Sequence, residues 1–243
     1  MVENLYIQGY LAYWDYLLMH NPNLMIDSCA SGGRRNDLET MRRSVPFHQT
    51  DFGYGHHPIK QKFNRHLYGW IPYFRGFWAN WDDANGEYTK PDYYAPLARP
   101  SYEEFDMFCT FAPMMHLCTC REPEVIEREK ALVALHKRVR HNLREDFYAL
   151  TEAHCDRMKW TAWQFDSPDA KEGFIQFFRN TGAPEDSFNV KLKALCPCAT
   201  YIFENGRTGE KIEMTGEKAM TEGFTESLDK RQASLWIYTA KRT

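Results

Sequence analysis

The chain has 243 residues, and its 30 Lys and Arg residues nearly balance its 33 Asp and Glu residues. That balance excludes a polybasic nucleic-acid surface as the dominant feature, and no apolar run approaches the ~18 residues that a membrane span needs. A hydrophobic fraction of 43% beside 26% charged residues is typical of a soluble globular protein. Aromatic residues make up 15% of the chain, enough for a large core or for platforms that stack on sugars.

Cysteine spacing argues against a disulfide framework, because the seven cysteines include no CxxC pair. The nearest approach to a metal pattern is His116, Cys118 and Cys120, which a strand would place on one face. Free cysteines are more commonly small buried apolar residues than metal ligands, so we expect no metal site. The N-terminal MVENLYIQGY lacks the basic and apolar regions of a signal peptide, so a reducing, cytoplasmic location is expected.

The first part of the chain is predicted to alternate helices and strands. Apolar residues recur at helical spacing over 7–18, and Asn-Pro at 21–22 ends this helix. The apolar run at 24–28 predicts a strand covered on both faces. A Gly-rich turn follows it, and Asp37 is expected to cap a short helix that extends to Arg42.

Further strands are predicted at 44–48, 68–74 and 114–118. The segment 50–58 reads as a loop whose histidines, His57 among them, face solvent or sugar. A long helix is predicted from Pro123 to Asn142, since Pro suits a first turn and the apolar residues share one face.

Beyond residue 151 the pattern changes to short strands. Apolar centres recur every 11 to 14 residues, and turn signals such as Asn205-Gly206 and Thr215-Gly216 separate them. Such spacing predicts an antiparallel β-sandwich. The six centres are Phe174, Phe188, Tyr201, Ile212, Phe224 and Leu235.

The densest polar cluster follows the first predicted strand, in the run IDSCASGGRRND at 26–37. Parallel strands deliver site residues at their carboxyl ends in this way. Asp27 and Cys29 are two positions apart and are therefore predicted to share one side of the strand. A phosphate-binding loop is excluded, because neither GxGxxG nor GxxxxGK[ST] occurs.

A second carboxylate, Asp51, follows the next strand and is flanked by aromatic residues. Such surroundings raise the pKa of a carboxyl group and suit a general acid. The alternative role for a strand-terminal Asp is to cap the turn or helix that follows.

The run NPNLMIDSCASGGRRNDLETMRRSVPFHQTDF resembles glycoside hydrolase family 36, the retaining α-galactosidases. The barrel of that family carries a Cys-Ala-Ser-Gly-Gly turn and, further along, a Ser-Asp motif at the spacing found here, where Asp51 lies 22 positions after Cys29. The similarity extends over GYLAYWDYLL, DFYALT, WTAWQFDSPDAKEGFIQFFRN and the closing strands, and so covers nearly the whole chain.

The resemblance implies that Asp51 is the acid/base carboxylate and that Cys29 and Gly32 line the subsite for a terminal galactose-like ring. Asp27 is then expected to support the floor of that pocket, and Arg35, which matches the Arg after the family's Gly-rich turn, to act as a structural support as much as a ligand. The implied substrate is an oligosaccharide or α-galactoside, with no metal or organic cofactor. The family usually has Ser where this chain has Thr50, and that departure leaves the sugar open.

The implied fold is the C-terminal half of a (β/α)8 TIM barrel in residues 1–150, followed by an antiparallel β-sandwich in residues 151–243. Retaining glycosidases also need a carboxylate nucleophile, which in the family lies on a barrel strand before the first helix of this chain. Asp15 follows a Trp, as that nucleophile does, but falls inside the predicted helix.

We therefore expect a fragment that holds the acid/base half of the site and is inactive alone. The alternative is a non-catalytic sugar-binding or structural remnant of such an enzyme. Half a barrel exposes strand edges, so self-association is expected, without nucleic-acid or membrane partners.

Overall fold

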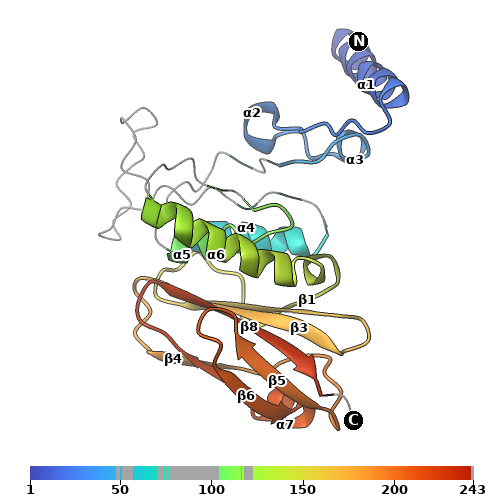
Figure 1. Cartoon of the computed structure of the whole chain (residues 1–243). Helices are drawn as coiled ribbons and strands as arrows, with labels where there is room; N and C mark the ends of the chain where they lie inside the picture. Colours follow the sequence, from blue (N-terminus) through green and yellow to red (C-terminus); the bar gives the residue numbers. More distant parts are fainter. Residues whose placement is uncertain are drawn as a thin grey trace. The chain divides into compact units, whose positions relative to one another are not determined.

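The computed structural model describes residues 1–47, 50, 57–70, 74, 76, 104–115, 117 and 123–241. The chain forms two compact units, Met1–Phe52 with Tyr73–Arg75 and Gly53–Pro72 with Gly76–Thr243 (Figure 1). No helix in the described ranges combines the length and the apolarity needed to cross a membrane.

The first unit contains the helices α1 (Val2–His20), α2 (Ala30–Gly33) and α3 (Leu38–Met41). The predicted first helix is confirmed by α1, in which Trp14 is the buried residue. The predicted short helix is confirmed by α3, and Asp37 caps it through a hydrogen bond of 2.9 Å from the Thr40 N–H.

One parallel bridge joins the two predicted strands of this unit, between Asp27 and Val45. The Ser28 N–H donates to the Val45 carbonyl at 3.1 Å, and the Val45 N–H donates to the Ile26 carbonyl at 2.9 Å. The expectation that 24–28 is covered on both faces is wrong, since Met25 is 64% exposed. In the described residues this unit contains no closed barrel, and the half barrel stays a prediction.

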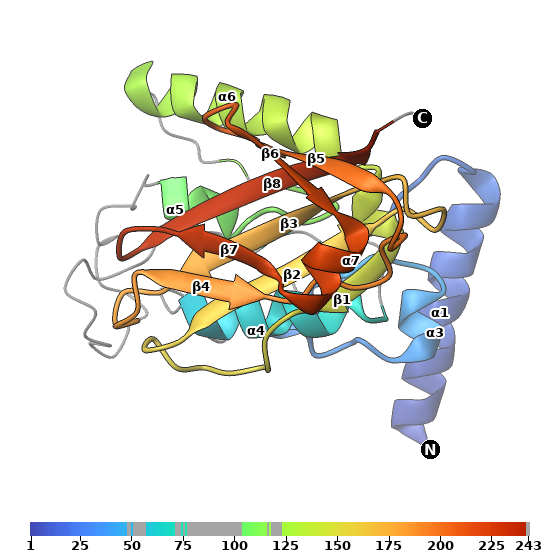
Figure 2. The ribbon, with the colours of Figure 1, turned by 90° about the horizontal axis from the view of Figure 1, so that it is seen from below.

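The second unit is built on a six-stranded antiparallel sheet with the order β1-β2-β3-β8-β5-β6, and β4 pairs with β7 in a separate two-stranded sheet. Figure 2 shows β8 lying between β3 and β5. The strands are β1 (Asp146–Ala149), β2 (Trp160–Asp166), β3 (Glu172–Arg179), β4 (Ser187–Val190), β5 (Thr200–Asn205), β6 (Lys211–Thr215), β7 (Phe224–Ser227) and β8 (Gln232–Ala240).

All six apolar centres predicted from the sequence fall on strands, from Phe174 on β3 to Leu235 on β8. The prediction missed β2, whose residues are all buried. A strand covered on both faces lacks the alternation of apolar and polar residues by which half-exposed strands are recognised.

Helices cover one face of the large sheet (Figure 1). These are α4 (His57–Tyr68), α5 (Glu104–Phe108) and α6 (Pro123–Val139), followed by the 3-10 helix η1 (Asn142–Arg144). The long helix predicted to end at Asn142 is confirmed and ends three residues earlier. The expected loop at 57–58 and the expected strand start at Tyr68 are wrong, because these residues belong to α4.

The sheet therefore separates two hydrophobic cores. Phe174 and Phe178 of β3 pack in the core beneath the helices, whereas Ile175 and Phe177 pack in the core toward β4, β7 and α7 (Gly216–Thr221). Helices on one face and a small second sheet on the other make this a mixed helix and antiparallel-sheet unit. The domain boundary at residues 150 and 151 stays a prediction.

Candidate functional site

The candidate site begins where the Asp27 strand ends. Asp27 and Cys29 are both exposed, while Ser28 between them is 4% exposed, which is the alternation expected of a strand. The Asp27 carboxylate accepts a hydrogen bond of 3.2 Å from the Phe47 N–H, next to the bridge at Val45. Asp27 therefore holds the second strand in register with the first as that strand leads toward Asp51.

Cys29 and Gly32 belong to one tight turn at the end of this strand. Cys29 precedes α2, and its carbonyl accepts a hydrogen bond of 2.6 Å from the Gly33 N–H. Gly32 and Gly33 have φ angles of 72° and 75°. This left-handed backbone is open to glycine at little cost and explains the Gly-Gly pair.

Arg35 follows the turn, and its guanidinium contacts tyrosines of α1. Its guanidinium lies over the Tyr10 ring, 4.7 Å from the ring centroid, and hydrogen bonding to Tyr10 and then to Tyr6 raises the Arg35 pKa. Within the described contacts Arg35 is therefore a support that ties the turn to α1.

Asp15, the carboxylate that superficially matches a nucleophile motif, is engaged in an ion pair. Its two carboxylate oxygens accept from Arg43 Nε at 2.6 Å and from Arg43 Nη2 at 2.9 Å. Hydrogen bonding to Arg43 lowers the Asp15 pKa. An exposed helical carboxylate held in a bidentate pair is a structural element, as the helix pattern predicts.

Asp51 lies outside the described residues, as do the aromatic candidates Tyr54, Trp78 and Trp81. The soft-ligand pattern at His116, Cys118 and Cys120 also lies outside them. Among the residues that are described, no group of three His, Cys, Asp or Glu side chains could hold a metal ion.

A buried charge cluster in the second unit was not predicted from the sequence. Asp106 on α5 is fully buried, and its carboxylate lies 2.5 Å from His57 Nε2 and 3.2 Å from Arg231 Nη2. His57 is thus not the solvent-facing histidine expected from its place near a loop. Burial lowers the His57 pKa, against the opposing effect of Asp106.

The buried face of α4 continues this cluster with polar side chains. His57, Lys60, Gln61 and Asn64 are all buried and are spaced as one helical face. Gln61 accepts from Thr161 Oγ1 at 2.7 Å. Burial lowers the Lys60 pKa to about 8. The sequence does contain this helical spacing, but the residues at the buried positions are polar. A search for apolar residues at helical spacing therefore does not detect the helix.

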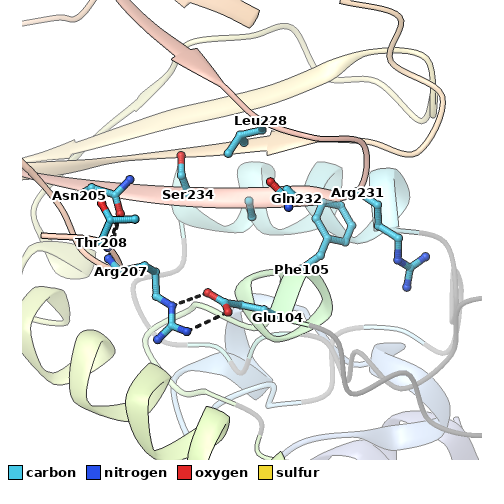
Figure 3. A pocket seen from close by; sticks show the side chains of 10 residues that line it. Glu104, Phe105, Asn205, Arg207, Thr208, Leu228, Arg231, Gln232 and Ser234 are labelled. Atoms are coloured by element: carbon cyan, nitrogen blue, oxygen red, sulfur yellow. Dashed lines mark hydrogen bonds and ion pairs between the residues drawn. The ribbon is translucent and has the colours of Figure 1, made fainter. Parts of the chain in front are cut away.

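A hollow of about 380 Å³ lies between α5 and β8 (Figure 3). Glu104 and Arg207 form an ion pair of 2.5 Å at its edge. Asn205 Oδ1 accepts from the N–H groups of Arg207 and Thr208, and Ser234 Oγ donates to Glu226. These polar groups are therefore already paired with one another or with the backbone of the protein.

Solved structures share this arrangement of helices and sheet. The galactosidase domain of the α-galactosidase–sucrose kinase AgaSK matches 97% of this chain with a TM-score of 0.64 and 14% identity. The family 36 α-galactosidase AgaB from Geobacillus stearothermophilus matches 94% with a TM-score of 0.63 and 19% identity. Protein-family models and curated protein sequences give no match.

The likeness confirms the resemblance to glycoside hydrolase family 36 at the level of the fold. The chain spans 31% of the AgaSK chain and 30% of the AgaB chain. It therefore corresponds to about a third of these proteins.

Proposed function

We propose that this chain supplies the acid/base side of an α-galactosidase-type retaining glycoside hydrolase site. The observation that carries the proposal is the parallel bridge between Asp27 and Val45. It sets two strands side by side, one ending in the Cys29–Gly33 turn and the other leading toward Asp51. The carboxyl ends of neighbouring parallel strands are where barrel enzymes build their sites.

In this proposal Asp51 protonates the glycosidic oxygen as the bond to the leaving group breaks, and later removes a proton from the attacking water. A covalent glycosyl-enzyme intermediate forms between these steps, on a carboxylate about 5–5.5 Å from the acid/base. Cys29 and the Gly32 backbone border the sugar ring, while Asp27 and Arg35 hold the strand and the turn in place.

The proposal assigns the nucleophile to a segment outside residues 1–243. The two carboxylates nearest the turn in sequence, Asp27 and Asp37, accept backbone hydrogen bonds, and Asp15 is paired with Arg43. We therefore expect the purified chain to show no turnover of an aryl α-galactoside. Steady hydrolysis by the chain alone would place a nucleophile inside it.

The acid/base role is tested in a protein that joins this chain to a nucleophile-bearing segment. Asp51→Asn is expected to lower turnover of an alkyl α-galactoside by about 10²–10⁴-fold. The loss should be much smaller in the first step with a dinitrophenyl galactoside, because that leaving group departs without protonation.

Asp37→Asn is the matched control, since Asp37 caps α3. Its effect should not depend on the leaving group. If Asp51→Asn behaves like this control, the acid/base assignment is wrong. If the unsubstituted joined protein binds galactose but hydrolyses no α-galactoside, the chain is a sugar-binding remnant.

A further inference from the structure

Two exposed cysteines lie close together in the loop between β4 and β5. Cys196 and Cys198 flank Pro197, and their Sγ atoms are 3.3 Å apart. Neither takes part in the proposed glycosidase chemistry. Among the described residues this is the one pair of cysteines in sulfur–sulfur contact.

The backbone around this pair is held in place from several sides. The Cys196 N–H donates to the Tyr201 hydroxyl at 3.0 Å, and that hydroxyl donates to the Ala170 carbonyl at 2.7 Å. The Glu217 N–H donates to the Pro197 carbonyl at 3.1 Å. Because the loop is already ordered, bringing the two sulfurs together costs little further conformational entropy.

Glycine at position 216 allows this packing. A Cβ there would overlap the Cys196 carbonyl oxygen, so the loop approaches the start of α7 more closely than any other residue would permit. The close approach fixes the Cys196 backbone, while both thiols stay at the surface.

The two thiols differ in electrostatic surroundings. The pKa of Cys196 is lowered, first by the hydrogen bond from the Cys198 thiol and then by the backbone N–H groups of Cys198 and Ala199. The same thiol contact raises the pKa of Cys198. Cys196 is therefore the better thiolate, and Cys198 keeps its proton more readily.

We propose that Cys196 and Cys198 form a reactive dithiol that exchanges with low-molecular-weight disulfides. The Cys196 thiolate attacks one sulfur of the small disulfide, forms a mixed disulfide and releases one thiolate. Cys198 then loses its proton and attacks the Cys196 sulfur, which forms the Cys196–Cys198 disulfide and releases a second thiolate. The small disulfide gains two electrons and, after protonation, leaves as two thiols, while the protein dithiol is oxidised.

The product would be readily reduced again. A disulfide across a single intervening residue is sterically constrained, and exposed or strained disulfides have more oxidising potentials than buried structural ones. The pair would therefore act reversibly rather than as a permanent staple.

The test uses the purified chain, reduced and then exposed to oxidised glutathione, with each cysteine mapped by peptide mass spectrometry. The expected product is an internal Cys196–Cys198 disulfide that retains no glutathione. Cys155, also exposed, is the internal reference, and it should react more slowly and end as a glutathione adduct.

Two variants separate the roles of the pair. Cys198→Ser should trap a stable glutathione adduct on Cys196, and Cys196→Ser should slow the reaction at Cys198 to the rate of Cys155. The proposal is overturned if wild-type Cys196 and Cys198 react no faster than Cys155 and end as separate adducts. This outcome is independent of any glycosidase activity.

Discussion

Lys60 is a buried ammonium group, and burial lowers its pKa from the ordinary 10.5 to about 8. Between these pH values the unfolded chain holds a proton that the folded chain has lost, so stability rises with pH. The slope reaches about 1.4 kcal/mol per pH unit. Above about pH 9 the buried Cys109, whose pKa burial raises, offsets this rise.

We therefore expect the free energy of unfolding to increase from pH 8 to pH 9 in urea titrations. Lys60→Met should remove the increase, and Lys62→Met, on the same helix, should keep it. An increase that persists unchanged in Lys60→Met would contradict the assignment of this pH dependence to Lys60.

Asp166 is expected to weaken the fold at neutral pH. Burial raises its pKa to about 6, although a hydrogen bond from the Tyr238 hydroxyl acts in the opposite direction. Between the ordinary carboxyl pKa of 3.8 and about 6 the folded state holds a proton that the unfolded state has lost, so stability falls as pH rises.

Asp166→Asn keeps an acceptor for Tyr238 and removes the titration. The thermal midpoint of the variant should lose the decline that Asp166 causes between pH 4 and pH 6, and at pH 7 it should exceed that of the wild type. A lower midpoint in the variant at pH 7 would show that the ionised carboxylate stabilises the fold.

The buried Asp106 carboxylate contacts both His57 and Arg231. Removing it leaves the Arg231 guanidinium without this carboxylate partner. Breaking a buried pair from one side costs about 3–5 kcal/mol. Asp106→Ala should therefore lower the free energy of unfolding by that order. Glu104→Ala, which breaks a partly exposed pair with Arg207, should cost about 1 kcal/mol or less. Equal losses in the two variants would contradict this account.

At the residue scale the sequence predicted local roles better than buried ones. The cap at Asp37 follows from local spacing, and the structure confirms it. The sequence predicts a surface position for His57, because its partner Asp106 is far along the chain and no local pattern connects the two residues. The role of Asp51 stays a prediction.

At the scale of elements, β3 depends on a glycine for its fit between β2 and β8. A Cβ on Gly173 would overlap the Phe165 carbonyl oxygen and the Tyr238 hydroxyl. Gly173→Ala should cost about 1–3 kcal/mol through overpacking. Gly9→Ala, with nothing within 4 Å of the added Cβ, should not lower the unfolding midpoint. A Gly173→Ala variant as stable as wild type would mean that the strands separate easily here.

Elements with one covered face were the predictable ones. The apolar centres Tyr201 and Ile212 lie on β5 and β6, whose residues alternate in burial, and the helix from Pro123 follows its apolar face. β3 is buried on both faces and was marked only by its centre Phe174. β2 and α4 were missed for opposite reasons. The first is buried on both faces and shows no alternation, and the second buries polar residues at helical spacing.

At the scale of the whole molecule, α1 exposes large apolar side chains, with Leu5 62% and Met19 71% exposed. Exposed apolar surface of this kind favours association. We expect sedimentation velocity to show dimers or larger species, and Leu5→Glu with Met19→Glu to shift the chain toward monomer. A wild-type chain that stays monomeric at every concentration measured would contradict the expectation.

The overall architecture could be predicted only in part. The sheet was expected, but the pattern of strands and helices before residue 150 does not reveal that α4 and α6 cover this sheet. Which surfaces pack together depends on contacts between distant segments, and these leave no periodic signal in one sequence.

The central claim, an acid/base role for Asp51, is tested most directly by azide rescue. The protein that joins this chain to a nucleophile-bearing segment is assayed as Asp51→Asn with a dinitrophenyl α-galactoside and sodium azide. We predict faster turnover and an α-galactosyl azide product, since azide needs no general base and attacks the covalent intermediate. No acceleration, or a β-galactosyl azide product, would contradict the assignment.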